Sequence, residues 1–452
     1  MSVQKKSNPV VCLVNLGCPK NQVDAEMILG ALDGAGYTIC CDPEQAEIII
    51  VNTCSFLKTA RQESLETLER MLELKKAGLV KQVIVSGCMA DRDRKYLKSI
   101  VGGIDQFLSP FQIDQTIRIL GLDQSIRLPV KPGKSYMPEG IRLMTTPRSY
   151  GYLKIADGCD NRCSFCRIPY LRGSFRSRAP EDIIDEAAGL IESGRREIVV
   201  ISQDSTAYGQ DNPRFGDLCA LLEGLSRLHG LKWLRLMYLY PAGITEKLLR
   251  LIADSPVICR YLDIPLQHVD YRVLKSMNRR IPELAGQASL DIEDFLNAVK
   301  KWVPDIAVRS TLMTGYPGED EKSFEKMLNL VKSGIFEHLG VFTWSCEPNT
   351  AAAKFQAEAV DRREAEKRAS ELMEAQAEVV VQRNLARLNK TYDVVIDGPG
   401  DEEGFVLGRL EFQAPEVDGM VKLRGCYAPG TWLKARLSDV DLYDFEGIVV
   451  DK

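Results

Sequence analysis

The chain has 452 residues, of which 45% are apolar and 27% are charged, and this composition predicts folded domains with apolar cores. The first fifteen residues contain two lysines and no apolar h-region of the kind that signal peptides have, and no run of about 18 apolar residues occurs later, so neither a signal peptide nor a membrane span is indicated. With a net charge of −5, we expect a cytoplasmic protein of two or three domains.

Thirteen is an odd number of cysteines, and a reducing cytoplasm argues against a disulfide framework. Clustered cysteines in such a compartment more often serve metal or redox chemistry. Seven of them read as ordinary small apolar residues, namely Cys12, Cys40, Cys41, Cys219, Cys259, Cys346 and Cys426. The other six fall into two groups of three.

The N-terminal region alternates strands and helices. Short β-branched runs at 10–16, 47–53 and 81–87 predict strands, and the stretches between them, 21–36 and 58–78, predict helices. This alternation is typical of a parallel sheet covered by helices.

Cys18, Cys54 and Cys88 each follow one of these three strands directly. The carboxyl ends of parallel strands meet at one edge of the sheet, where ligands collect, so we expect the three thiols to converge. Gly17 before Cys18 and Gly87 before Cys88 give the backbone room to turn. Any one of these cysteines could be a plain buried thiol, but the three together indicate a shared metal site.

A second alternating region begins near residue 152. Its expected strands are 152–156, 197–202, 234–241, 261–267, 305–315 and 338–344. Its expected helices are 180–194, 213–229, 244–254, 288–302 and 320–334. Six β/α units in series predict a barrel or partial barrel of TIM type, whose chemistry lies at the carboxyl ends of the strands.

The first of these strands leads into ADGCDNRCSFCRIPYLRG at 156–173, with cysteines at 159, 163 and 166 and no fourth. A structural zinc site needs four ligands, and the chain's histidines, at 229, 268 and 338, are all more than sixty residues from Cys166. A cubane iron–sulfur cluster fits better, because three thiolates would bind three irons and leave the fourth iron open.

After a long helix expected at 357–390, the last segment alternates short strands with Gly and Pro turns, which predicts a small antiparallel β-barrel. Residues 390–452 hold seven Lys and Arg against thirteen Asp and Glu, a net charge of −6. A tRNA-binding domain should be basic, so this charge favours a basic protein partner, although it could also serve solubility alone.

The C-x3-C-x2-C motif, with Phe165 before its last cysteine, resembles the radical S-adenosylmethionine (SAM) superfamily. Together with the N-terminal cysteines and a last segment similar to a TRAM module, the whole chain resembles the methylthiotransferases. NLGCPKNQVDAE at 15–26 and YLDIPLQH at 261–268 look like the RimO branch, which modifies an aspartate of ribosomal small-subunit protein twelve. The implied domains are 8–125, 145–385 and 388–452.

The resemblance implies two [4Fe–4S] clusters and SAM as cofactors. One cluster would be held by Cys159, Cys163 and Cys166 and would cleave SAM to a radical; the other, held by Cys18, Cys54 and Cys88, would supply the methylthio group. An electron donor such as flavodoxin or ferredoxin is implied, and the substrate protein could be free or in the ribosome. No catalytic acid–base residue is expected, because the cofactors carry the chemistry.

By analogy with the superfamily, the side chains expected to contact SAM are Phe165, Ser202, Gln203, Asp263, Gln267, Arg309, Thr311 and Gly315. Each residue apart from Phe165 could equally be an ordinary strand-end or surface residue. His268 is interpreted as a structural histidine. The stretch 277–294 departs from the family's usual glycine-rich turn, which leaves its role in substrate contact open.

Two other functions remain as alternatives. The same chemistry on a tRNA adenosine, as in the MiaB-like branch, is disfavoured by the acidic last segment and by the CPKN turn, so we expect no direct tRNA binding. An iron–sulfur scaffold or electron carrier would leave the barrel unexplained, and it would make no 5'-deoxyadenosine when reduced with dithionite.

Overall fold

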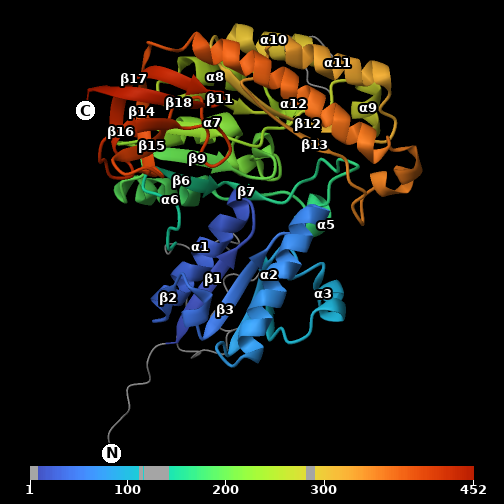
Figure 1. Cartoon of the computed structure of the whole chain (residues 1–452), viewed down its shortest axis with the longest axis vertical. Helices are drawn as coiled ribbons and strands as arrows, with labels where there is room; N and C mark the ends of the chain where they lie inside the picture. The colour runs from blue at the N-terminus through green and yellow to red at the C-terminus, as the bar shows by residue number, and fades with distance from the viewer. Residues whose placement is uncertain (1–8, 111–115, 117–141, 281–290, 452) are drawn as a thin grey trace, which may run out of the picture. The chain divides into compact units, whose positions relative to one another are not determined.

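The computed structural model describes residues 9–110, 116, 142–280 and 291–451 (Figure 1). The chain forms two compact units. The first comprises Met1–Thr145, Asp157–Asp160 and Cys166–Ser174, and the second comprises Thr146–Ala156, Asn161–Phe165 and Phe175–Lys452. No helix in the described ranges is long and apolar enough to cross a membrane. The expected domain end at residue 125 lies outside the described residues.

A parallel five-stranded sheet forms the centre of the first unit, in the order β2-β1-β3-β4-β5. Its strands are β1 (Val10–Asn15), β2 (Thr38–Cys40), β3 (Ile48–Thr53), β4 (Gln82–Gly87) and β5 (Gln106–Leu108). The three longer strands are those predicted, whereas β2 and β5 are too short to show a pattern in the sequence. The strand order reverses between β1 and β3, which is where sheets of this kind open a ligand crevice.

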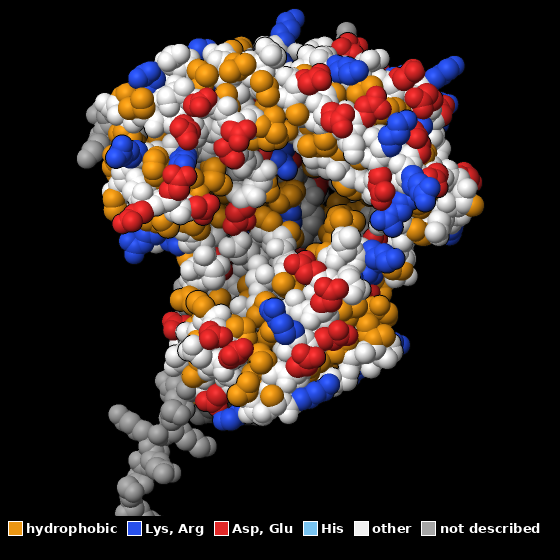
Figure 2. Space-filling model, viewed as in Figure 1, with side chains coloured by type: hydrophobic (Ala, Val, Ile, Leu, Met, Phe, Trp, Pro, Cys, Tyr) orange, Lys and Arg blue, Asp and Glu red, His pale blue; other side chains and the backbone are white. Residues whose placement is uncertain are grey.

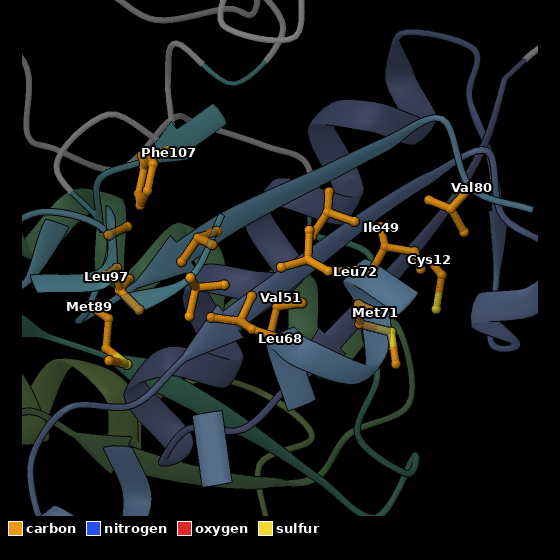
Figure 3. Close-up of a cluster of buried hydrophobic side chains, with 14 of the residues drawn as sticks. Cys12, Ile49, Val51, Leu68, Met71, Leu72, Val80, Met89, Leu97 and Phe107 are labelled. Atoms are coloured by element: carbon orange, nitrogen blue, oxygen red, sulfur yellow. The ribbon is translucent and has the colours of Figure 1, made fainter. Parts of the chain in front are cut away.

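Helices cover both faces of this sheet. They are α1 (Pro19–Gly34), α2 (Lys58–Lys76) and α3 (Arg94–Ile100). Figure 3 shows the apolar cluster on one face, where Leu68 of α2 and Leu97 of α3 join Ile49 and Val51 of β3. Successive strand residues point to opposite faces, so the fully buried Ile50 faces the other side, where α1 contacts the sheet. Burial on both faces explains why these strands are continuous apolar runs.

Six parallel strands form the sheet of the second unit, in the order β6-β9-β10-β11-β12-β13. The strands are β6 (Tyr150–Lys154), β9 (Glu197–Ile201), β10 (Trp233–Leu236), β11 (Ile258–Asp263), β12 (Ala307–Thr314) and β13 (His338–Thr343). The helices between them include α6 (Pro180–Glu192), α7 (Leu218–Ser226), α8 (Glu246–Asp254), α9 (Tyr271–Ser276), α10 (Ile292–Trp302) and α11 (Glu321–Lys332). Within the described residues the sheet is open, which confirms the predicted partial barrel.

Helix α12 (Arg362–Leu385) leads to a closed C-terminal β-barrel in the order β14-β15-β16-β18-β17. Its strands are β14 (Thr391–Pro399), β15 (Phe405–Arg409), β16 (Val421–Arg424), β17 (Trp432–Asp441) and β18 (Asp444–Asp451). Buried residues such as Val394, Leu423 and Phe445 fill its centre. The predicted barrel is confirmed, with one difference: β16 and β18 pair in parallel, whereas the other pairs are antiparallel.

The C-terminal β-barrel packs on the amino-terminal part of the parallel sheet within the second unit. Tyr150 and Tyr152 of β6 donate hydrogen bonds to the Glu416 carboxylate, at 2.6 and 3.1 Å. Tyr261 of β11 donates to Asp418 at 2.8 Å. These contacts occupy the amino-terminal mouth of the partial barrel, so the carboxyl end is the one left for ligands.

A buried ion network joins the two parts of this unit. Glu197, the first residue of β9, pairs with Arg235 at 2.7 Å and with Arg409 of β15 at 2.8 Å. Arg409 also pairs with Asp397 at 2.6 Å. Burial opposes the charged form of Glu197, but the guanidinium groups of Arg409 and Arg235 outweigh it and hold the pKa of this carboxyl below its ordinary value. The carboxylates and guanidinium groups of this network are therefore charged, and each lies beside a group of opposite charge.

We predict that Arg409→Met lowers the free energy of unfolding of the second unit by about 3–5 kcal/mol, because it leaves Glu197 and Asp397 undercompensated at a buried site. Urea denaturation of the metal-free protein measures this. Lys434→Met is the matched control, since it breaks the exposed pair with Asp393 and should cost less than about 1 kcal/mol. Equal effects of the two substitutions would show that the network contributes no more than a surface pair.

Candidate functional site

The three N-terminal cysteines lie at the carboxyl ends of neighbouring strands. Cys18 follows β1, Cys54 follows β3 and Cys88 follows β4, and these strands are adjacent in the sheet. Cys18 and Cys54 therefore flank the point between β1 and β3 where the strand order reverses. The placement agrees with the expected convergence of the three thiols.

Two glycines make the turns beside these thiols possible. A Cβ on Gly17 would lie 2.2 Å from the Nδ2 atom of Asn21, too close for any other residue. Gly87 has a φ of 82°, and a Cβ there would lie 2.4 Å from the carbonyl oxygen of Thr53. Cys18 itself caps the N-terminus of α1, an end that favours negative charge.

The three thiols are close enough to influence one another. Burial raises the pKa of Cys54 to about 12, and the neighbouring Cys88 and Cys18 add to the rise. Burial also raises the pKa of Cys88, while the charge of Arg172 opposes the rise. Thiols of this kind need a cation or a metal to become thiolates, which are the form that binds iron.

No three His, Cys, Asp or Glu side chains in the described ranges converge as the ligands of one ion would. A cubane cluster makes a different demand, because each cysteine binds a separate iron. Three mutually interacting thiols around a ligand crevice fit such a cluster better than they fit a single ion.

Arg172 forms a buried polar centre beside these loops. It ends helix α5 (Ile168–Arg172), is 1% exposed, and belongs with the first unit. Its guanidinium donates to Asp24 of α1 at 2.8 Å, to Asp157 at 3.3 Å and to the side-chain oxygen of Asn21. The Cys88 thiol contacts the same Asn21 oxygen at 3.7 Å. Arg172 thus fixes the start of α1 and brings positive charge to Cys88.

Arg167, at the other end of the same turn, is equally buried. Its guanidinium donates to the carbonyl of Ser55 at 2.7 Å and to Asp93 at 2.9 Å. Ser55 follows Cys54, and Arg167 follows Cys166. Arg167 therefore connects the segment that follows Cys166 with the segment that follows Cys54.

The second group of cysteines lies in the loop after β7 (Ala156–Asp157). Cys159, Cys163 and Cys166 are all partly exposed, as ligands of an accessible cluster should be. The amide of Cys159 donates to the carbonyl of Gly173 at 3.2 Å, and the amide of Ile168 donates to the Cys166 sulfur at 3.4 Å. The first bond fixes the backbone of the loop, and the second ends on a sulfur atom.

Arg279 contacts the middle thiol of this group. Its guanidinium donates to the Cys163 sulfur at 3.5 Å and to the carbonyl of Pro265, and it lies over the ring of Tyr240 at 4.8 Å. Sequence reasoning missed Arg279, although it lies in the stretch 277–294 flagged as unusual. Residues 281–290 of that stretch lie outside the described residues.

Phe165 belongs to a run of aromatic rings in the second unit. It packs edge-on against Tyr316 at a centroid distance of 6.5 Å, and Tyr316 packs edge-on against Trp344 at 6.2 Å. The Tyr316 hydroxyl lies 2.7 Å from that of Ser164. Tyr316 follows β12 and was not singled out from the sequence, yet it anchors the cysteine loop from the strand side.

Gln267 is the expected SAM contact with the most distinctive geometry. It has a left-handed φ of 74°, held by hydrogen bonds from its amide to Thr311 and from Met313 to its carbonyl, at 2.8 and 2.7 Å. Its Oε1 atom is buried and has no hydrogen-bond partner among the described residues. A strained backbone that presents an unsatisfied buried acceptor fits a ligand-binding position.

The other expected contacts near the carboxyl ends are less distinctive. Ser202 and Gln203 follow β9, and Ser202 is fully buried beside Ser205, with hydroxyls 3.3 Å apart. Thr311 is partly exposed on β12. Gly315 has a φ of 80°, and a Cβ there would lie 2.6 Å from Ala365 of α12. The backbone conformation and the contact with α12 are enough to explain why this position is a glycine.

Arg309 is placed differently from the rest. It occupies the third position of β12, pairs with Asp418 and donates to the carbonyl of Val417, so it faces the C-terminal β-barrel. Asp263 lies near it, 3.9 Å from the Arg309 Nε atom. Arg309 is at the level of the occupied mouth, whereas Asp263 is the last residue of β11 and accepts a hydrogen bond at 3.0 Å from the amide of Tyr238, which follows β10.

His268 is fully buried, as a structural histidine should be. Its Nδ1 atom accepts a hydrogen bond from the amide of Asp270 at 2.9 Å, and its Nε2 atom lies 3.6 Å from Glu319. Glu319 is also held by Arg368 of α12 at 2.7 Å. The histidine therefore supports the turn after β12.

Family models match three segments of the chain. Residues 10–109 match the Uncharacterized protein family UPF0004, residues 153–331 match the Radical SAM superfamily, and residues 390–450 match the TRAM domain.

Curated relatives match over nearly the whole length. Proteins named "Ribosomal protein uS12 methylthiotransferase RimO" are 38% identical in Citrifermentans bemidjiense, covering 99% of this chain and 100% of the relative, and 40% identical in Aquifex aeolicus, covering 96% of each. The relative of that name in Geobacter sulfurreducens is 39% identical, covering 97% of this chain and 98% of the relative.

Among solved structures, the radical S-adenosylmethionine methyltransferase TsrM from Kitasatospora setae is similar, with a TM-score of 0.52. It is 15% identical, over 76% of this chain and 77% of that one. At this identity the likeness concerns the fold alone.

We predict that Arg172→Met reduces the iron bound after reconstitution toward half of the wild-type amount, because the thiols at Cys18, Cys54 and Cys88 lose their cation and the anchored start of α1. Iron analysis of the reconstituted protein measures this. Arg142→Met is the matched control, since it removes a buried arginine paired with Glu26 of the same helix. Equal iron loss in both variants would indicate general damage to the fold rather than a role for Arg172 at the thiols.

Proposed function

The chain belongs to the family of ribosomal protein uS12 methylthiotransferases, and on this premise we propose that it is a radical SAM enzyme acting on uS12, the ribosomal small-subunit protein twelve. In the proposed reaction a methylthio group replaces one hydrogen on the β-carbon of an aspartate. The observation that carries the proposal is the full-length likeness to these relatives, combined with two separate groups of three cysteines.

Two [4Fe–4S] clusters and SAM are the cofactors. We assign Cys159, Cys163 and Cys166 to the cluster that binds SAM, and Cys18, Cys54 and Cys88 to the second cluster. When bound, these groups supply the radical and sulfur chemistry that turns a C–H bond into a C–S bond. A one-electron donor such as flavodoxin or ferredoxin supplies the reducing equivalent.

The task of the chain's own residues is to bind and orient SAM. The unsatisfied Oε1 atom of Gln267 is suited to a donor on SAM, and the Phe165 ring to stacking near its adenine. Ser202, Gln203 and Thr311 are further candidates at the carboxyl ends of the strands. Arg309 is a weaker candidate, because its neighbours Asp418 and Val417 belong to the C-terminal β-barrel, whereas Asp263 is a further candidate at the carboxyl end of β11. No acid–base pair is required of the protein.

The charge of the C-terminal β-barrel supports a basic protein substrate over tRNA. Part of its net charge of −6 is used internally, because Asp418, Glu416 and Asp397 bond within the second unit. The hairpin of β17 and β18 still exposes Asp439, Asp441, Asp444 and Glu446. On the face in Figure 2, acidic and basic side chains are interspersed. We therefore propose a basic substrate in the cytoplasm and no direct tRNA binding.

Mass spectrometry of intact uS12 tests this function. In cells that lack the gene, we expect uS12 to lose the mass of one SCH3 group in place of hydrogen. The wild-type gene should restore this mass, whereas Cys54→Ala and Cys163→Ala genes should not. If uS12 is unchanged while a tRNA adenosine loses a methylthio group, the MiaB-like alternative is correct.

A further inference from the structure

A positively charged surface covers the short helix α3 and the turn before it. Arg92, Arg94, Lys95 and Lys98 are all exposed, and we call these four side chains the α3 basic surface. Figure 1 shows α3 at the periphery of the first unit. Such a concentration of cations stands out on a chain whose net charge is −5.

These cations are largely available to a partner. Within the described residues, the only carboxylate in ion-pair range of the surface is Asp91, 3.7 Å from Arg92. Arg94 and Lys98 lie over the ring of Phe107, at 4.7 and 5.6 Å from its centroid. Their charges are therefore held in place by an aromatic ring but are not neutralised.

Apolar side chains are exposed among these cations. Tyr96 and Ile100 lie four residues apart on α3, and they are 49% and 48% exposed. Residues at this spacing lie on one side of a helix. A small apolar contact within a ring of one charge is typical of transient, electrostatically steered protein encounters.

The α3 basic surface connects directly to the cysteine loops of the same unit. Asp93, which precedes α3, accepts the hydrogen bonds of Arg167, and Arg167 follows Cys166. The hydroxyl of Tyr170 donates to the carbonyl of Arg92 at 3.2 Å. The guanidinium groups of Arg92 and Arg167 both lie within 6 Å of the Tyr170 ring centroid, at 5.9 and 5.6 Å.

The order of residues along the chain gives a second connection between the α3 basic surface and the cysteine-bearing segments. Helix α3 begins six residues after Cys88, and Arg167 also donates to the carbonyl of Ser55, next to Cys54. The surface therefore adjoins the segments that carry Cys54, Cys88 and Cys166. A partner seated on it lies near the proposed iron sites.

We propose that the α3 basic surface is the docking site of an acidic one-electron carrier protein, an inference that rests on the proposed function. The reduced carrier gives up one electron and is oxidised by that electron. The cluster assigned to Cys159, Cys163 and Cys166 accepts it and is reduced by one electron. No proton or leaving group is involved in this step.

The location favours a redox protein over an RNA. Both are negatively charged and would be attracted to the α3 basic surface. An electron donor must approach an iron site, whereas a phosphate backbone has no such requirement. The bonds that join Asp93 and Tyr170 to the cysteine-bearing segments therefore point to the carrier.

The test compares two reductants in the full-length protein with both clusters reconstituted. The variant carries Arg94→Glu, Lys95→Glu and Lys98→Glu together. The readout is the rate of 5'-deoxyadenosine formation from SAM, driven either by a reduced flavodoxin of net negative charge or by dithionite. We expect the flavodoxin-driven rate to fall at least about tenfold at low salt, since steering by charge changes association rates by this order. The dithionite-driven rate should not change.

Lys76→Glu is the matched control. It reverses an exposed charge at the end of α2, which lies at the edge of the sheet away from the cysteines. We expect its flavodoxin-driven rate to equal that of the wild type. Added salt should slow the wild type toward the rate of the triple variant, because it screens the attraction.

The possible outcomes separate the two claims. If the flavodoxin-driven rate is unchanged in the triple variant, the docking site is wrong, and loss of RNA binding by that variant would assign the surface to RNA instead. If dithionite yields no 5'-deoxyadenosine with the wild type, the proposed function fails before docking is tested. A fall with both reductants, accompanied by iron loss, would also overturn the proposal, because the surface would then support the clusters.

Discussion

Two buried guanidinium groups, those of Arg167 and Arg172, hold together the loops on which the proposed chemistry depends. Both lie on the single helical turn that follows Cys166, and each is 1% exposed. Buried arginines of this kind are stable only when carboxylates and carbonyls satisfy them. Asp93, Asp24 and Asp157 do so here, and these partners come from the turn before α3, from α1 and from β7. The segment after Cys166 is therefore part of the first unit's polar core.

This arrangement explains how a sheet edge can serve as a cluster site. The strand order reverses between β1 and β3, and Gly17 and Gly87 allow the turns that place Cys18 and Cys88 at that edge of the sheet. Apolar burial alone would keep these thiols protonated, as the raised pKa values of Cys54 and Cys88 indicate. Arg172 supplies the opposing charge. Within the second unit, the C-terminal β-barrel occupies the amino-terminal mouth of the partial barrel.

The sequence was sufficient for the six strands of the partial barrel, the three long strands of the first sheet and the C-terminal β-barrel, because each has a clear hydrophobic period between turn residues. It also placed Cys18, Cys54 and Cys88 after three long strands, and the assignment of the six cysteines to two clusters stays a prediction. The sequence could not reveal that Arg167 and Arg172 form a buried polar core, because their partners Asp93 and Asp24 are 74 and 148 residues away along the chain. Arg309 was expected among the cofactor contacts by analogy with the superfamily, and in the structure it pairs with Asp418 of the C-terminal segment, a contact between residues 109 positions apart that the sequence could not show.

The central claim is that the strand-end cysteines hold a second iron–sulfur cluster independently of the first. Iron analysis and Mössbauer spectroscopy of a variant with Cys159→Ala, Cys163→Ala and Cys166→Ala test it most directly. We predict that this variant keeps half of the wild-type iron as a [4Fe–4S] cluster, and that adding Cys54→Ala removes it. A triple variant that binds no iron under the same reconstitution would contradict the account, because Cys18, Cys54 and Cys88 would then hold no cluster of their own.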